Sequence, residues 1–270
     1  GLGRTIKIDK VSSRDKRQAM DDIIPRESLI TIYINRKKIC VISCSPQHIT
    51  ELAAGYAVSQ GYIDDHDSID IIEVCEPGDG AEDKSRTHRP FMENIPVKIQ
   101  AGSQAVKEQP ASYITPGCGS LEEEAAFLLP DPVETGLRIK SEVILGLNRK
   151  NLAVQENKKA LGGLHSAALF DLRGQLLLVR EDIGRHNCMD KIIGNSLIDD
   201  MDLTDKTIFT SGRISMDLVL KAVRVKIPVL VSNSSVTHSA VNLAGKLGLT
   251  AVGYARGNRF NIYSYPERII

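Results

Sequence analysis

One cysteine stands apart from the other four by its surroundings. Cys118 lies between Gly117 and Gly119, with Pro116 before them, which predicts an accessible loop. A nucleophilic or sulfur-carrying cysteine reacts as its thiolate, so its pKa of ~8.5 has to be lowered by positive charge or by a helix N-terminus. A helix predicted to begin near Leu121 could lower it. The sequence leaves two interpretations open, a reactive Cys118 and an incidental exposed thiol.

Three segments share a chemistry suited to anions. Each follows a predicted strand and is rich in Ser, Gly, Asn or Arg: Ser211–Arg213, Ser232–Ser235 and Arg256–Arg259. The carboxyl ends of parallel strands meet at one edge of a sheet, where open α/β folds bind ligands. Helix N-termini attract phosphate, and arginine pairs with it through two hydrogen bonds. The segments predict a crevice for an anionic ligand such as a nucleotide, although such residues also form turns and caps without any ligand.

Two further segments hold histidines. Arg180–Asn187 carries Arg185 and His186 at the entry to a predicted helix, where it could orient a ligand or bind across a dimer. Alternatively, its acidic residues favour the helix N-terminus and His186 is structural. His165 begins a predicted strand beside two glycines, which allow a ligand or another chain to approach closely. A lone histidine is nevertheless more often structural than catalytic.

The other cysteines are predicted to pack inside the protein. Cys40, Cys44 and Cys75 lie in β-like runs and Cys188 lies on a predicted helix. The even spacing of Cys40 and Cys44 puts both on one strand face, where free cysteine behaves as a small hydrophobe, so packing is favoured over zinc. Five irregularly spaced cysteines, without an export signal, indicate reduced thiols and no disulfide framework.

Composition excludes several classes of protein. The 270 residues carry 34 basic and 34 acidic side chains, so a strongly basic nucleic-acid binder is not expected. No apolar run approaches the roughly 18 residues of a membrane span, and the first residues lack the apolar core of a signal peptide. A cytoplasmic protein without a membrane or nucleic-acid partner is expected. Aromatic residues make up only 4%, so the core must consist of Ile, Val, Leu and Ala, as in a sheet covered by helices.

The chain is predicted to have three parts. Residues 1–20, which are rich in charged side chains, are expected to be a flexible, solvated tail. Residues 21–135 are expected to form a smaller α+β portion, and Pro130 and Pro132 mark the region of its boundary. Residues 136–270 are expected to form an α/β domain.

The α+β portion is expected to contain short strands and one helix. Its β-like runs lie at residues 29–34, 39–43, 69–75 and 95–99. The first two flank a polar turn, which predicts a hairpin. The helix follows the hairpin directly, with Ser45 as its N-cap and Gly61 at its end.

The last portion alternates between helices and strands. Ser141 is expected to cap a helix, and an antiparallel pair follows around the turn at residues 171–174. Met189, Ile192 and Ile193 indicate the buried face of the next helix. Thereafter strands and helices alternate at residues 207–210, 215–226, 228–231, 237–247 and 249–254, with a last run at 260–264 as an edge strand. Short connections between alternating elements predict a largely parallel sheet between helix layers.

Several motifs occur in a fixed order along the chain. They are Leu52–Tyr56, Gln60–Ile63, Gly162–Phe170, Val179–Asn187, Ser211–Arg213 and Gly253–Tyr263. Together they resemble the FdhD family, the formate dehydrogenase accessory sulfurtransferases. The resemblance covers nearly the whole chain apart from the tail and the polar loop at residues 76–94.

The resemblance implies a sulfur carrier. In this family, a cysteine takes sulfur from a cysteine desulfurase as a persulfide. It then delivers the sulfur to the molybdenum of bis-molybdopterin guanine dinucleotide before that cofactor enters formate dehydrogenase. By position, Cys118 would be the catalytic persulfide carrier, although many members have Cys-x-x-Cys where this chain has a single cysteine. One cysteine suffices in principle, because transfer requires one nucleophilic sulfur and an acceptor.

The resemblance also implies where the cofactor would be held as bound cargo. The cofactor-binding segment of the family falls on Tyr254, Ala255, Arg256, Gly257, Asn258 and Arg259, within the predicted anionic crevice. Ser211, Gly212 and Arg213 would also hold phosphates, and His165, Arg185 and His186 are further candidates. A homodimer is expected, because a large cofactor with two nucleotide arms suits a two-fold site.

The family fold is similar to that of cytidine deaminases, which implies a three-layer C-terminal domain. A zinc deaminase requires His-x-Glu on one helix and Pro-Cys-x-x-Cys on the next. The corresponding helix entries here hold His186-Asn187-Cys188 and Ser211-Gly212-Arg213, so zinc deamination is disfavoured and no zinc is expected. A non-catalytic chaperone that binds the finished cofactor is the remaining alternative.

Overall fold

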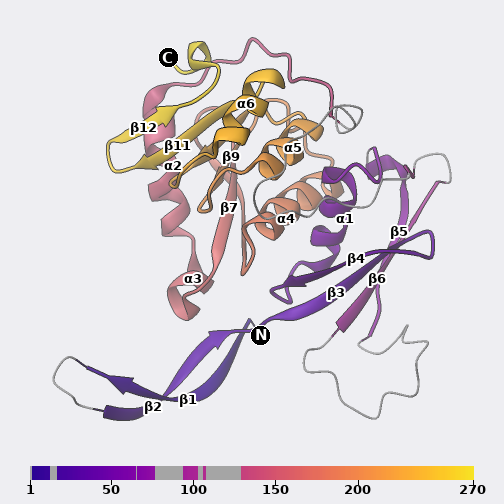
Figure 1. Cartoon of the computed structure of the whole chain (residues 1–270), viewed down its shortest axis with the longest axis vertical. Helices are drawn as coiled ribbons and strands as arrows, with labels where there is room; N and C mark the ends of the chain where they lie inside the picture. Colours follow the sequence, from indigo (N-terminus) through magenta and orange to yellow (C-terminus); the bar gives the residue numbers. More distant parts are fainter. Residues whose placement is uncertain (1, 13–16, 65, 77–93, 103–105, 108–128) are drawn as a thin grey trace.

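The computed structural model describes residues 2–12, 17–64, 66–76, 94–102, 106–107 and 129–270. Within them the chain is a mixed α/β protein with a two-stranded, a four-stranded and a six-stranded sheet and six α-helices (Figure 1). Cys118 lies outside the described residues. None of the described helices has both the length and the apolar composition needed to cross a bilayer.

The two-stranded sheet replaces the expected flexible tail. β1 (Gly3–Val11) and β2 (Arg17–Pro25) pair in antiparallel fashion, and Figure 1 shows this ribbon projecting away from the rest of the molecule. Strands were not expected in this segment, although Ile6 and Ile8 alternate with charged residues at strand period. Most of its side chains are solvated, as expected.

The four-stranded sheet contains the predicted hairpin. β3 (Ser28–Ile34) and β4 (Lys37–Cys44) are antiparallel, and Asn35 and Arg36 between them have φ of 46° and 69°. Two positive φ angles are what a two-residue hairpin turn requires. β6 (Asn94–Ala101) lies parallel to β3, and β5 (Ile69–Val74) lies antiparallel to β6. The strand order is β4-β3-β6-β5.

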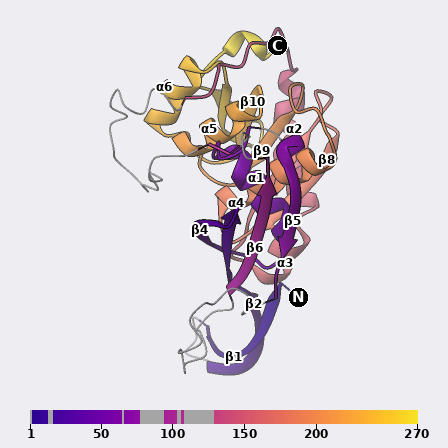
Figure 2. The ribbon, with the colours of Figure 1, turned by 90° about the vertical axis from the view of Figure 1, so that its right-hand side faces the viewer.

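Helix α1 (Ile49–Ser59) covers one face of this sheet (Figure 2). It begins later than predicted, because His48 and not Ser45 precedes its first turn, and His48 makes no side-chain cap. The backbone N–H of Ser45 donates to Asp182, and its hydroxyl accepts from the backbone N–H of Ile183. Ser45 therefore connects the end of β4, in the four-stranded sheet, to the end of β8, in the six-stranded sheet, instead of capping α1. Gly61, with φ of 76°, follows the helix end as predicted.

The six-stranded sheet forms the larger part of the molecule. Its strands, in spatial order, are β12 (Arg259–Ile262), β11 (Thr250–Arg256), β10 (Val229–Ser232), β9 (Thr207–Thr210), β7 (His165–Phe170) and β8 (Leu176–Asp182). Strands β9, β10 and β11 are parallel neighbours. β7 runs antiparallel to both β8 and β9, and β12 runs antiparallel to β11. The sheet is thus mixed, and the prediction of a largely parallel sheet needs correction: tight hairpin turns after β7 and β11 force reversal of direction.

Helices cover both faces of this sheet. The helices after β6 are α2 (Ser141–Ala153), α3 (Glu156–Leu161), α4 (Arg185–Ile198), α5 (Met216–Arg224) and α6 (His238–Lys246), and short 3₁₀ turns lie at His66–Ser68 and Pro266–Arg268. α2 packs on one face through Ile144 and Leu147. α4, α5 and α6 pack on the other face. Ser141 is the first residue of α2, one position after its expected place as the cap.

The two larger sheets are joined where α1 crosses α4. A Cβ atom on Gly55 would lie 1.9 Å from the carbonyl oxygen of Asp190, and one on Gly194 would lie 1.8 Å from that of Glu51. Only glycine at both positions allows the two backbones to approach so closely. The layers from α2 through the six-stranded sheet, α4 and α1 to the four-stranded sheet therefore form one stack (Figure 1). The boundaries at residues 20 and 135 stay predictions.

Candidate anion-binding site at the strand ends

The topology brings the predicted anion-binding segments to one edge of the six-stranded sheet. β8, β9, β10 and β11 all end there, and β7 begins there, since His165 pairs with Asp182 across the antiparallel β7–β8 register. We call this edge the strand-end rim. It consists of His165, Arg185, His186, Ser211, Gly212, Arg213, Ser232, Ser234, Tyr254, Arg256, Gly257, Asn258 and Arg259.

Ser211 links the ends of two strands. Its hydroxyl accepts from the backbone N–H of Ser166 at 2.9 Å and lies 3.4 Å from Nδ1 of His165. Burial, reinforced by the positive charges of Lys158 and Arg185, lowers the pKa of His165 below its ordinary value of 6.5. His165 is therefore neutral at pH 7 and can hydrogen-bond a ligand without carrying charge.

Gly212 provides the surface on which Arg185 lies. A Cβ atom at Gly212 would lie 2.7 Å from Cβ and 2.6 Å from Cδ of Arg185, so the arginine stem packs directly on the glycine backbone. The hydroxyl of Ser232 donates to the carbonyl oxygen of Gly212 at 2.6 Å and accepts from the backbone N–H of Ser234 at 2.9 Å. The turns after β9 and β10 are thereby fixed to each other.

Within the residues that the structure describes, neither Arg185 nor Arg213 forms a salt bridge with a carboxylate. Nε of Arg185 is buried and has no hydrogen-bond partner. Burial and the nearby charge of Arg213 lower the pKa of Arg185, whereas Asp217 raises it. A buried donor without a partner is uncommon in native proteins. An anion placed between Arg185 and the exposed Arg213 would supply the acceptor and remove the repulsion.

His186 reaches residues that sequence reasoning missed. Its Nε2 lies 3.2 Å from the hydroxyl of Ser215 and 3.5 Å from Oδ2 of Asp217, and Gln60 donates to Oδ1 of the same carboxylate at 3.3 Å. Burial lowers the pKa of His186 to about 4, against the opposing effect of Asp217. Asp217 lies in the first turn of α5, which is the signal that could have indicated it.

The turn between β11 and β12 holds the third predicted segment. Tyr254 has a φ of 53° at a register shift in β11, and its backbone N–H donates to the carbonyl oxygen of Ser234 at 2.8 Å. The guanidinium carbon of Arg256 lies 5.9 Å from the centre of the Tyr254 ring. The turn residues from Arg256 to Arg259 are exposed. Ala255 differs from its neighbours, because its side chain packs in the core and only its backbone faces the edge.

The acidic residues before α4 have structural contacts. Asp182 accepts from Nζ of Lys191 at 2.5 Å, from Nδ2 of Asn187 at 2.9 Å and from the backbone N–H of Gly184 at 2.9 Å. Glu181 accepts from the backbone N–H groups at the start of α3. These bonds hold the entry to α4, and hence Arg185 and His186, in place.

The rim is cationic. Within the described part of the chain, none of Arg213, Arg256 and Arg259 forms an ion pair with a carboxylate. Of the carboxylates near the rim, Asp182 is paired with Lys191 and Asp217 contacts His186. The three predicted segments and the two histidine-containing segments therefore meet at an edge that suits a polyanion with several phosphate groups.

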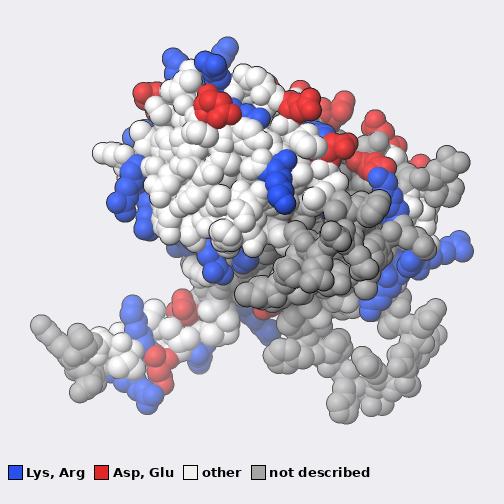
Figure 3. Space-filling model, turned by 45° about the horizontal axis from the view of Figure 1, so that its top comes forward, with Lys and Arg blue, Asp and Glu red and all other residues white. Residues whose placement is uncertain are grey.

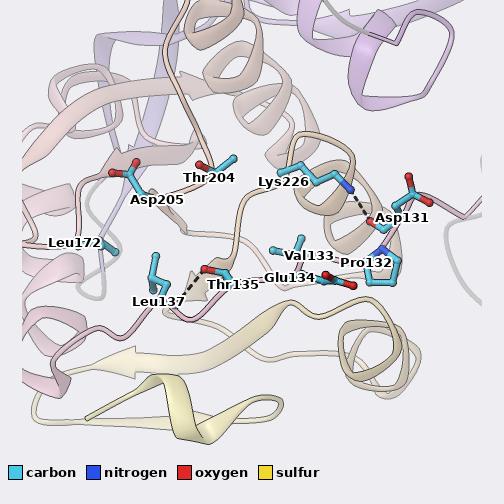
Figure 4. A pocket seen from close by; sticks show the side chains of 10 residues that line it. All are labelled: Asp131, Pro132, Val133, Glu134, Thr135, Leu137, Leu172, Thr204, Asp205 and Lys226. Carbon is cyan, nitrogen blue, oxygen red and sulfur yellow. Dashed lines mark hydrogen bonds between the residues drawn. The ribbon is translucent and has the colours of Figure 1, made fainter.

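A groove lies at the opposite end of the sheet. It has a volume of about 780 Å³ and is lined by Asp131, Pro132, Val133, Glu134, Thr135, Leu137, Leu172, Thr204, Asp205 and Lys226 (Figure 4). Lys226 is held by the carbonyl oxygen of Asp131 at 3.0 Å. Figure 3 views this end and shows acidic side chains gathered along its upper margin. Three carboxylates around one lysine disfavour a polyanion, and no predicted site residue lines this groove.

The described cysteines are poor nucleophiles. Cys44, Cys75 and Cys188 are buried and Cys40 is half-buried. Burial raises the pKa of Cys40 to about 11 and that of Cys44 to about 12, and it raises the pKa of Cys188 as well. They pack as predicted, and Cys118 remains the candidate for sulfur chemistry.

Comparison with known proteins places this geometry in a family. A sulfur carrier protein FdhD from Listeria innocua is 33% identical over 260 residues, covering 93% of each chain. Another from Sulfolobus acidocaldarius is 34% identical over 270 residues, covering 98% of each chain. A crystal structure named as that of a formate dehydrogenase accessory protein, from Desulfotalea psychrophila, superimposes over the whole of both chains with a TM-score of 0.79 and 26% identity. Residues 25–270 match the model of the FdhD/NarQ family, and the chain belongs to that family.

Proposed function

We propose that the chain is a sulfurtransferase that carries sulfur to the bis-molybdopterin guanine dinucleotide form of the molybdenum cofactor before formate dehydrogenase takes it up. The relatives' names, sulfur carrier protein and formate dehydrogenase accessory protein, support the class of activity. The observation that carries the proposal for the cargo is the strand-end rim, with Arg185 beside Arg213 and a buried guanidinium Nε that has no partner.

Cargo binding would depend on the arginines and on shape. Arg185 and Arg213 would hold one pyrophosphate, because both guanidinium groups present forked donors to phosphate oxygens. Arg256 and Arg259, on the exposed turn after β11, would hold the phosphates of the other nucleotide arm. His165 and His186, both neutral at pH 7, would hydrogen-bond the cargo without adding charge. The molybdenum is part of the cargo and is the acceptor of the sulfur.

The sulfur step requires one thiolate. The Cys118 thiolate would attack the terminal sulfur of a persulfide on a cysteine desulfurase, forming a new S–S bond and breaking the old one. The desulfurase cysteine leaves as a thiolate, so the exchange is balanced without an outside oxidant or reductant. A reduced thiol is required beforehand, which fits the cytoplasmic location that we propose for the protein.

We also propose that the six-stranded sheet and its helices form a cytidine-deaminase-like domain. What supports this is the presence of helices on both faces of the sheet, with α2 opposite α4, α5 and α6. In this fold the strand ends that bind a base in a deaminase would bind the guanine dinucleotide here.

The test combines sulfur loading with cargo binding. Purified chain is incubated with a cysteine desulfurase and cysteine, and the mass of the Cys118 peptide is measured with and without Cys118→Ser. A mass gain of one sulfur in the parent chain alone supports the carrier. Cells that lack the endogenous accessory protein should regain formate dehydrogenase activity with the parent chain and not with Cys118→Ser.

Cargo binding is tested at the rim with guanosine diphosphate as the probe. The double substitution Arg213→Gln and Arg256→Gln should lower its affinity at least tenfold. Arg173→Gln is the matched control, since Arg173 is an exposed arginine in the turn at the opposite edge. Normal cargo binding without any persulfide would establish a chaperone and contradict the carrier; equal binding by all variants would contradict the rim.

A further inference from the structure

Ser215 occupies the N-cap position of α5 without capping the helix. Its backbone is extended, with φ of −102° and ψ of 168°, but its hydroxyl does not accept from the N–H groups of the first turn. Thr237, at the same position of α6, accepts from the backbone N–H of Ala240 at 3.3 Å, as a side chain at an N-cap normally does. The hydroxyl of Ser215 lies instead 3.2 Å from Nε2 of His186. Its position therefore serves the histidine and not the helix.

Asp217 determines which ring nitrogen of His186 carries the proton. Its Oδ2 lies 3.5 Å from Nε2, and Gln60 donates to its Oδ1 at 3.3 Å. Burial acts to raise the pKa of Asp217, but Lys221, His186 and Gln60 together hold it below its ordinary value. An ionised carboxylate repels a lone pair on Nε2 and attracts an Nε2–H. The carboxylate therefore favours the proton on Nε2, where the hydroxyl of Ser215 accepts it.

The ring of His186 carries a single proton at neutral pH. Burial lowers its pKa to about 4; Asp217 acts to raise this pKa, and Arg185, Lys221 and His165 lower it further. With the one proton on Nε2, the lone pair of Nδ1 is left as an acceptor. Within the described part of the chain, Nδ1 has no hydrogen-bond partner, and the side chain is 36% exposed. A ligand in the rim can therefore reach this acceptor.

An acceptor of this kind differs from the arginines of the rim. Arg185, Arg213, Arg256 and Arg259 can only donate, which suits the oxygens of a phosphate. An unprotonated Nδ1 repels a phosphate oxygen and pairs only with a donor. In the proposed cargo, guanine and pterin share an aminopyrimidinone ring, whose ring N–H and amino group are neighbouring donors. His186 is therefore suited to a ring of the cargo and not to its phosphates.

We propose that Asp217 and Ser215 are positioning residues that hold His186 as its Nε2–H tautomer, so that Nδ1 accepts from the N–H edge of an aminopyrimidinone ring of the cargo. The identity of the ring rests on the proposed function, whereas the tautomer does not. The arginines bind the phosphates and His186 binds the ring edge. The rim thereby distinguishes an anion that carries guanine or pterin from a simple polyphosphate.

Nitrogen NMR of the full chain tests the tautomer without any cargo. In protein with isotope-labelled histidine at pH 7, His186→Phe identifies the signals of His186, and we expect a protonated Nε2 and an unprotonated Nδ1. Asp217→Asn removes the charge that favours Nε2–H and should move the proton in part to Nδ1. Asp199→Asn, which removes an exposed carboxylate beyond the other end of α4, is the matched control and should leave the signals unchanged. A proton on Nδ1 in the parent, or an unchanged ratio in Asp217→Asn, overturns the positioning role.

Calorimetry with guanosine diphosphate, pterin and inorganic pyrophosphate tests the acceptor. His186→Phe should weaken binding of guanosine diphosphate or pterin roughly fivefold, the size of one lost hydrogen bond, and leave pyrophosphate binding unchanged. The ring-bearing probe that loses affinity identifies the ring at Nδ1. Arg213→Gln, for comparison, should weaken pyrophosphate binding as well.

Two results for His186→Phe would contradict the acceptor role: weaker pyrophosphate binding, or unchanged binding of both ring-bearing probes. A parent chain that binds none of the three probes would contradict the proposed cargo, and the ring contact with it. The NMR signals of His186 decide the tautomer in either case, so the two failures can be told apart.

Discussion

The α1–α4 contact and the strand-end rim both concentrate charge, and they use it differently. In the contact, each charge has an opposite partner: Lys191 with Asp182, Lys221 with Asp190 and Arg180 with Glu51. In the rim, within the described residues, Arg185, Arg213, Arg256 and Arg259 have no such carboxylate partner. A buried pair fixes a fold, whereas an unpaired cation on a fixed scaffold is available to a ligand.

The Glu51–Arg180 pair illustrates the first use. Nε of Arg180 lies 2.5 Å and its Nη2 2.7 Å from the two carboxylate oxygens of Glu51. Burial alone would raise the pKa of Glu51, but the hydrogen bonds from Arg180 and His48 lower it to about 2. The carboxylate therefore stays ionised and paired at neutral pH.

Removing one partner of a fully buried pair should have the largest effect. We expect Lys191→Met to lower the free energy of unfolding by about 3–5 kcal/mol, because Asp182 would remain buried as an uncompensated charge. Urea unfolding at pH 7 measures the loss. Lys246→Met, at the exposed end of α6, is the control and should change it by less than about 0.5 kcal/mol. If Lys191→Met lowered the free energy of unfolding as little as the control does, the Lys191–Asp182 pair would not stabilise the α1–α4 contact.

A methyl group at the helix crossing should have the next largest effect. We expect Gly194→Ala to destabilise by about 1–3 kcal/mol or more, because the new Cβ overlaps the backbone of α1. Gly146→Ala is the matched control, since that helical glycine in α2 has open space around it and alanine should stabilise it by about 0.5–1 kcal/mol. Thermal unfolding of both variants would show opposite signs; equal signs would contradict the close crossing.

In the rim, loss of a charge should weaken binding without destabilising the fold. We expect Arg185→Met to weaken guanosine diphosphate binding about tenfold, or about 1.4 kcal/mol, while the fold gains about 0.5–1 kcal/mol because an unpaired, half-buried charge is removed. Calorimetry and urea unfolding on the same samples separate the two effects. A variant that binds guanosine diphosphate normally but unfolds more easily would show that Arg185 has a structural role. The proposed difference between the rim and the α1–α4 contact would then not hold.

The smallest expected effect concerns the titration of His186. Its folded pKa of about 4 lies below the ordinary 6.5, so between these values the unfolded chain binds a proton that the native chain does not. Stability should therefore fall as pH falls from 6.5 towards 4, by at most about 1 kcal/mol because the ring is partly exposed. His186→Asn should remove this part of the pH dependence. An unchanged slope would show that burial in the folded chain does not lower the pKa of His186.

The rim could be predicted from the sequence because its position follows from chain order. Ser211–Arg213 and Ser232–Ser235 directly follow buried strands, so a parallel arrangement alone brings them together. Arg185 and His165 join the same edge through an antiparallel pair, and a hairpin turn was visible in the sequence. The reversal of β7 relative to β9 was not, since pairing between distant strands has no local signal.

The α1–α4 contact could not be predicted for a different reason. In the sequence, Gly55 and Gly194 each resemble an ordinary helical glycine. Only the structure shows that the two helices cross at these positions, where a Cβ atom would overlap the other backbone. Ser45 likewise lies where the sequence predicts a helix cap. In the structure, however, its backbone N–H donates to the buried carboxylate of Asp182, which is distant in the sequence. For the ribbon, the alternation of Ile6 and Ile8 with Lys7 and Asp9 was a usable signal that the high charge of the segment concealed.

The packing of Arg185 on Gly212 limits how this protein can change over generations. Any replacement of Gly212 adds at least one carbon atom at the place where the Arg185 stem lies. Every amino-acid substitution at position 212 therefore has to displace Arg185. A lineage could alter that position only by moving or discarding Arg185 as well. The two residues should therefore be inherited as a pair, a pattern that a set of related sequences would reveal without any experiment on the protein itself.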